Sequence, residues 1–114
     1  MLWRLKKVLL KITQEDIDSA RALCDNGAPY CFRCPIAVAL TRELFPSTEY
    51  DVCVGTTYAT IYTKSNDIEY KRFRIEKDAL EVINQFDVEF RNDPSPCIVH
   101  LTKVPLDAKH EYNY

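Results

Sequence analysis

The spacing of apolar residues changes along the first third of the chain. Residues 3–12 are predicted to form a strand. Val8, Leu10 and Ile12 occupy every second position there, which indicates a half-buried strand. Thr13 and Asp16 follow directly with the spacing of a capping box, and the apolar residues after them recur at the helical period. Gly27 is expected to end this helix, because glycine adopts the left-handed conformation found there without strain. The chain therefore begins with a strand and a capped helix.

A second helix is predicted between two prolines. Pro35 suits the first helical position, where a missing N–H costs nothing, and Pro46 ends the helix. Ile36, Leu40 and Leu44 share one face, and smaller apolar residues lie beside them. An apolar arc of this width indicates a helix at the centre of the molecule.

Strand periodicity dominates the second half of the chain. Three segments rich in Thr, Ile and Tyr, at residues 50–54, 58–64 and 69–75, are separated by turn residues and predict an antiparallel meander. A helix is predicted over about residues 77–86, and a last strand over residues 97–104.

The predicted order is therefore strand, helix, helix, three strands, helix, strand. This order favours an α+β fold, with a small mixed or antiparallel sheet of about five strands and three helices on one of its faces. The 114 residues fit one domain, residues 1–114. Its polar end, residues 105–114, is expected to be a flexible tail.

Composition removes several classes of function. The formal net charge of -2 gives no long-range reason to bind nucleic acid, and the basic segment 71–74 is explained equally well by strand alternation. The chain has two glycines, which excludes the glycine-rich phosphate loops. No apolar run reaches the roughly 18 residues of a membrane span, and lysines interrupt the apolar residues near the start. We therefore expect a cytoplasmic protein with neither a nucleic-acid nor a membrane partner.

Five cysteines raise the question of metal or redox chemistry. Cys24, Cys31 and Cys34 are close in sequence, and the last two form a CxxC motif. A structural zinc site normally takes four ligands, so these thiols are weak metal candidates that would need a further ligand from elsewhere. Cys34 also precedes Pro35 as the predicted N-cap of a helix, where the dipole can lower a thiol pKa. We expect no bound metal and interpret the three cysteines as packed thiols.

Nucleophilic catalysis by cysteine needs a histidine and an orienting carboxylate or amide. The chain has two histidines, of which His100 lies on the polar side of the last predicted strand and His110 lies in the tail. A dyad of Cys34 with His100 is the remaining option, and we rank it below a surface role for His100. The expectation is a protein that is not an enzyme and holds no cofactor.

The loop between the first two helices carries the candidate partner-binding residues. Tyr30, Phe32 and Arg33 precede the start of the second helix, and these residue types are enriched in the hot spots of protein interfaces. The alternative is that both rings fold back onto the core. A second aromatic strip on a sheet face is predicted from three tyrosines, Tyr58, Tyr62 and Tyr70.

Three segments resemble a group of small bacteriophage proteins. They are ITQEDI at residues 12–17, CPIAVAL at residues 34–40 and INQFD at residues 83–87. The second segment is the most specific and fits the pattern CPIAxAL. The likeness covers about residues 8–104, and the chain departs from the group around Tyr30 to Arg33 and after Pro105. It brings no catalytic residue with it.

The resemblance implies a phage origin and a class of function. Small phage accessory proteins commonly bind and block a host protein, and counter-defence proteins of the anti-CRISPR type are the prominent class. The expectation is a non-enzymatic binding protein that inhibits a host protein, with a defence nuclease complex as one such target. Two alternatives stay open: a sponge that sequesters a small signalling nucleotide between subunits, and a zinc or thiol-switch binding module. A homodimer also stays open.

Overall fold

The fold is given by a computed structural model that describes residues 6–29, 32–46, 48–86 and 93–105. Helices and strands follow in the order β1 (Lys6–Ile12), α1 (Gln14–Asp25), α2 (Pro35–Glu43), β2 (Tyr50–Val54), β3 (Tyr58–Thr63), β4 (Ile68–Ile75), α3 (Lys77–Gln85) and β5 (Cys97–Val104). The predicted α+β fold and its element order are confirmed. The predicted tail, apart from Pro105, lies outside the described residues.

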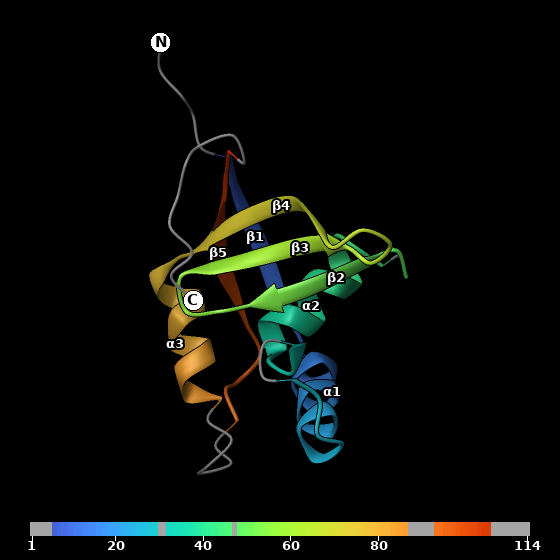
Figure 1. The fold of residues 1–114 in the computed structure, drawn as a ribbon. Helices are drawn as coiled ribbons and strands as arrows, with labels where there is room; N and C mark the ends of the chain where they lie inside the picture. The colour runs from blue at the N-terminus through green and yellow to red at the C-terminus, as the bar shows by residue number, and fades with distance from the viewer. Residues whose placement is uncertain (1–5, 30–31, 47, 87–92, 106–114) are drawn as a thin grey trace.

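The strands form one five-stranded sheet in the order β1-β5-β4-β3-β2 (Figure 1). Every neighbouring pair is antiparallel, so of the two predicted sheet types the antiparallel one is correct. β5, the last described strand, lies between β1 and β4, which brings the two ends of the described chain together. The edges of the sheet are β1 and β2.

Helix α2 lies at the centre of the helical layer. It contacts β1 and β2 of the sheet and both other helices, and Figure 1 shows it between α1 and α3. Its residues Ile36, Ala39 and Leu40 are fully buried. The wide apolar arc of this segment therefore predicted its central position correctly. None of the helices in the described ranges is long and apolar enough to cross a membrane.

Two helices begin with caps that the sequence predicted. The Thr13 side chain accepts a hydrogen bond from the Asp16 backbone N–H, and the Asp16 carboxylate accepts one from the Thr13 N–H, at 3.1 and 2.9 Å. At α2, the Cys34 sulfur accepts a hydrogen bond from the Ala37 N–H at 3.5 Å. Each cap satisfies backbone N–H groups that have no partner inside their helix.

Strand β4 contains a bulge that changes the predicted aromatic strip. Ile61 pairs with Lys71 but Tyr62 pairs with Glu69, which leaves Tyr70 as an extra residue. Tyr70 stacks on Tyr50, with ring centroids 5.0 Å apart, and meets the ring of the buried Phe45 edge-on. The strip of three tyrosines was therefore wrong, because the bulge moves Tyr70 into a different aromatic cluster.

Candidate functional site

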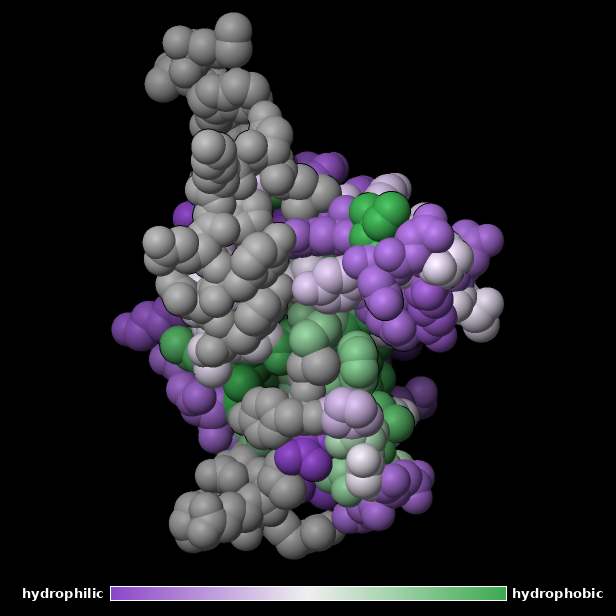
Figure 2. Space-filling view, in the orientation of Figure 1, coloured by the Kyte–Doolittle hydropathy of each residue, from purple (hydrophilic) through white to green (hydrophobic). Residues whose placement is uncertain are grey.

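A groove of about 830 Å³ lies between α1, α2 and the edge strand β2. We call it the α1–α2–β2 groove. Its apolar lining includes four half-buried side chains: Leu23 from α1, Phe32 from the loop before α2, Val38 from α2 and Tyr50 from β2. Val38 and Tyr50 also pack against the core. Figure 2 shows an apolar area below β2 on one face of the molecule, with hydrophilic residues toward the β3–β4 turn and α1.

Most of the charged side chains around the groove are paired with each other. The Arg42 guanidinium donates to both carboxylate oxygens of Asp16, at 2.9 and 2.8 Å, and to Glu43 at 2.6 Å. On the β2 side of the groove, the Lys64 Nζ lies 3.6 Å from an Asp51 carboxylate oxygen. The walls are thus apolar and the rim carries charges of both signs, an arrangement that is usual for a site that binds another molecule.

Asp16 holds one side of the groove in place. Its side chain is 2% exposed and takes part in the cap of α1. Burial alone would raise the pKa of this carboxyl, but hydrogen bonds from Arg42 and then from Thr13 outweigh it, so that the pKa lies below its ordinary value. Arg42 in addition donates to the Lys11 carbonyl at 3.0 Å, which ties the end of β1 to α1 and α2.

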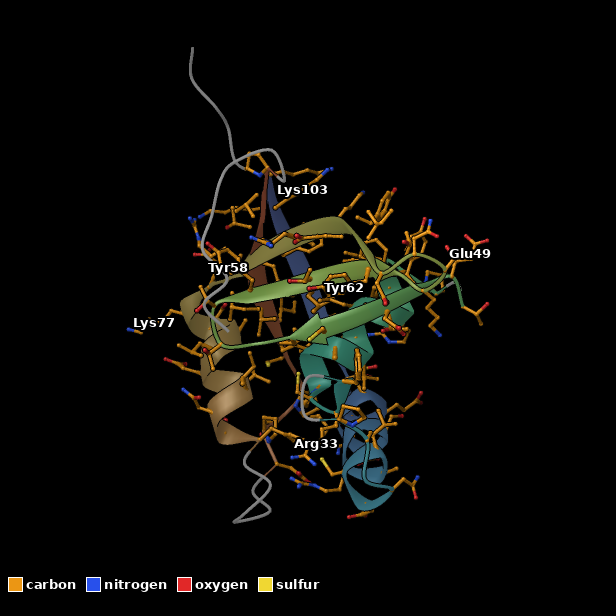
Figure 3. All side chains as sticks on the ribbon, viewed as in Figure 1. Arg33, Glu49, Tyr58, Tyr62, Lys77 and Lys103 are labelled. Carbon is orange, nitrogen blue, oxygen red and sulfur yellow. The ribbon has the colours of Figure 1, made fainter. Side chains whose placement is uncertain are left out.

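The predicted partner-binding residues do not share one location. Phe32 lines the α1–α2–β2 groove. Arg33 instead lines a separate cavity of about 20 Å³, together with Cys34, Val54 and residues of α3, and Figure 3 shows it below the start of α2. Tyr30 lies outside the described residues. Partner binding by the three together stays a prediction, and Phe32 is the member that the groove contains.

The cysteines next to the groove make ordinary contacts. The Cys24 thiol donates to the Arg33 carbonyl at 3.6 Å, and Cys34 acts as the cap of α2. Within the described ranges there is no group of three or more His, Cys, Asp or Glu side chains that could hold a metal ion. Cys31 lies outside those ranges, so zinc binding by the three weak candidates Cys24, Cys31 and Cys34 stays untested.

Replacing Cys34 with serine is expected to leave the free energy of unfolding within about 1 kcal/mol of the wild type, since a hydroxyl oxygen is at least as good a helix cap as sulfur. Urea denaturation of both proteins measures the difference. A sharp loss of stability together with released zinc would contradict the packing role and assign Cys34 as a ligand. Loss of fast alkylation at neutral pH, with unchanged stability, would instead assign a reactive thiolate.

His100 is bound to a carboxylate on another element. Its Nδ1 lies 2.6 Å from the Asp78 carboxylate, which also accepts from the His100 backbone N–H at 3.0 Å. Burial, and then the charge of Asp78, raise the pKa of the neighbouring Cys97, which therefore stays a protonated thiol at neutral pH. The described contacts of Cys34 are with other groups, so they give no support to the Cys34–His100 dyad, which from the sequence ranks below a surface role for His100.

The basic segment 71–74 is engaged within the protein. Arg72 is 1% exposed and donates to both Glu69 carboxylate oxygens, at 2.6 and 2.7 Å, on the sheet face opposite the helices. Its guanidinium lies 5.0 Å from the centre of the Tyr58 ring. Arg74 pairs with Glu76 at 3.1 Å. These contacts compete with phosphate groups and weaken the nucleic-acid interpretation of this segment.

Sequence reasoning missed two features of these sites. Tyr50 and Val38 were assigned to a strand and to a helix, and nothing local placed them across one groove. Arg72 was interpreted as an alternating surface residue, and its pairing with Glu69 had no local signal, because residues three apart on a regular strand point to opposite faces and the bulge at Tyr70 brings these two to one face.

Comparison with known proteins gives no relative: no family model, no curated protein and no solved structure is significantly similar to the chain.

Proposed function

We propose that this chain is a phage-encoded binding protein that inhibits a host protein in the cytoplasm through the α1–α2–β2 groove. The observation that carries the proposal is the groove itself, about 830 Å³ in volume and lined by half-buried Leu23, Phe32, Val38 and Tyr50. Water leaves such apolar surface when another protein fills the groove, and this is the main driving force of protein association. A defence nuclease complex is the class of target that the resemblance to phage proteins suggests.

Phe32 is the expected anchor of the interface. Aromatic residues in concave, partly desolvated positions contribute most of the binding energy at protein interfaces. Phe32 also sits in the loop that the sequence singled out, and its neighbours in the groove come from helices and a strand, which hold the site rigid. Arg33 does not share the groove and is expected to contribute less.

Replacing Phe32 with alanine is expected to weaken capture of the host partner by about 2 kcal/mol or more, which is typical of a hot-spot residue. The test is affinity capture from host lysate with the wild type, followed by titration of the captured protein against each variant. Lys77→Ala is the matched control, because Lys77 is exposed at the start of α3 and does not line the groove. Equal affinity of Phe32→Ala and Lys77→Ala would contradict the proposal.

A nucleotide sponge is the competing interpretation. The basic residues of the groove are Arg42 and Lys64, and both already face carboxylates, so a phosphate would have to displace Asp16, Glu43 or Asp51. A protein partner has no such requirement. Melting curves with a panel of signalling nucleotides separate the two, since a ligand that binds only the folded state raises the melting temperature.

A further inference from the structure

The outer edge of strand β2 is unoccupied in the part of the chain that the structure describes. β2 is the last strand of the sheet and pairs only with β3 there. Figure 1 shows it at the end of the sheet, with α2 and α1 below it. A sheet edge presents a row of backbone N–H and C=O groups to any segment that reaches it.

The hydrogen-bond pattern identifies the residues that present these groups. The Gly55 N–H donates to the Tyr58 carbonyl at 2.9 Å, and the Lys64 N–H donates to the Glu49 carbonyl at 2.8 Å. Residues of an antiparallel strand face their neighbour alternately, so odd-numbered residues from 49 to 55 are turned toward β3. Tyr50, Val52 and Val54 therefore direct their N–H and C=O groups outward. Figure 3 labels Glu49, the residue before β2, and Tyr58, the first residue of β3.

The two edges of the sheet differ in how they discourage pairing. β1 carries exposed lysines at Lys6, Lys7 and Lys11, and edge lysines are a common device against the addition of a further strand. β2 has the sequence YDVCV, with neither lysine nor proline, and the one bulge in the meander lies between β3 and β4. The edge of β2 carries one charged residue, Asp51, against three lysines on β1, and is the less protected of the two edges.

The open edge runs along the α1–α2–β2 groove. Tyr50, Asp51 and Val52 of β2 line that groove together with Phe32 and Val38. A strand added beside β2 continues the alternation of the sheet, so every second side chain would point to the helix-covered face and enter the groove. The side chains between them would lie beside Asp51 and Cys53 on the opposite face.

The charges at the rim specify the occupant further. Arg42 is paired with Asp16 and Glu43, and Lys64 with Asp51, so within the described residues Glu15 is the one charge of the groove lining that has no ion-pair partner. Its negative charge is complementary to a basic residue on the incoming segment.

We propose that the host partner contributes an extended segment that pairs with the free edge of β2. It places alternate apolar side chains in the α1–α2–β2 groove and a basic residue toward Glu15 at the rim. This mode of recognition takes affinity from backbone hydrogen bonds and specificity from pockets for alternate side chains. The inference rests on the proposed function and names how the partner binds.

A displayed library of random twelve-residue peptides, selected on the wild-type protein, tests this mode. The enriched sequences are expected to alternate apolar and polar residues and to contain lysine or arginine. Val52→Pro removes an outward N–H without touching the ladder to β3, and it should weaken the enriched peptides by about tenfold or more relative to Val52→Ala. Val52→Ala is the matched control, because it also changes the buried Val52 side chain but keeps the N–H.

Amide hydrogen exchange of the wild type tests the inference without any variant. The amides of Tyr50, Val52 and Val54 are expected to exchange fast in the free protein and to become protected by an enriched peptide. If these amides are protected in the free protein at low micromolar protein concentration, the inference is overturned. If the protein also sediments as a dimer, the edge is assigned to a second copy of the chain. Enriched peptides of helical periodicity, no enrichment, or equal binding to Val52→Pro and Val52→Ala would overturn it as well.

The outcomes separate this inference from the proposed function. If Phe32→Ala loses the enriched peptides while Val52→Pro keeps them, the groove binds its partner without strand addition, and only the inference fails. If the host partner binds Phe32→Ala and Val52→Pro as tightly as it binds the wild type, the proposed function fails together with the inference.

Discussion

Replacing Asp16 with alanine is expected to lower the free energy of unfolding by about 3 kcal/mol, since the change removes a helix cap and a hydrogen-bonded ion pair at once. The Asp16 carboxylate is almost fully buried, caps α1 and accepts two hydrogen bonds from Arg42. Urea denaturation measures the loss. Asp18→Ala is the matched control on the same helix, where the exposed Asp18 side chain accepts only from Gln14 and the cost should stay within about 0.5 kcal/mol.

The pH dependence of the Asp16 effect follows from its depressed pKa. A carboxyl with a lower pKa in the folded state stabilises the fold above the unfolded pKa of about 3.9 and loses this effect as the pH falls through the folded value. The difference in stability between wild type and Asp16→Asn should therefore be constant above about pH 5 and shrink in more acidic solution. A difference that does not change with pH would contradict the role of the charge.

Replacing Arg72 with methionine is expected to cost about 3–5 kcal/mol of stability, because it leaves the mostly buried Glu69 carboxylate without its guanidinium. Arg72 is 1% and Glu69 15% exposed, and two hydrogen bonds join them. Thermal or urea unfolding reports the loss.

Arg74→Met provides the matched control for this prediction. Arg74 is the same residue type on the same face of β4, but its side chain is 46% exposed and its partner is Glu76. Exposed ion pairs contribute about 0–1 kcal/mol, so this variant should be nearly as stable as the wild type. Similar losses for both variants would show that the burial of Arg72 does not control the effect.

The helices and strands were predictable because their signals lie within a few residues of each other. Thr13 and Asp16 form the cap of α1 within a single turn, and Pro35 fixes the start of α2 beside Cys34. The open choice between a mixed and an antiparallel sheet could not be settled in this way. β5 pairs with β1 across almost the whole chain, and no local residue specifies that pairing.

The groove could be predicted only in part, because it is formed by long-range contacts. Phe32 was identified from its loop and its residue type, but its groove neighbours Leu23 and Tyr50 come from α1 and β2. The bulge at Tyr70 is a second example, because it exists only through the register of β4 against β3. Such a shift moves a side chain to another cluster without any change in the local pattern.

The most direct test of the central claim is to map the footprint of the captured host partner on this protein by amide hydrogen exchange. The account predicts that binding protects backbone amides of β2 and of the segment around Phe32 and Val38, which border the α1–α2–β2 groove. It predicts no change around Asp78 and His100, which line a different hollow. Protection centred on Asp78 and His100, with β2 unchanged, would contradict it.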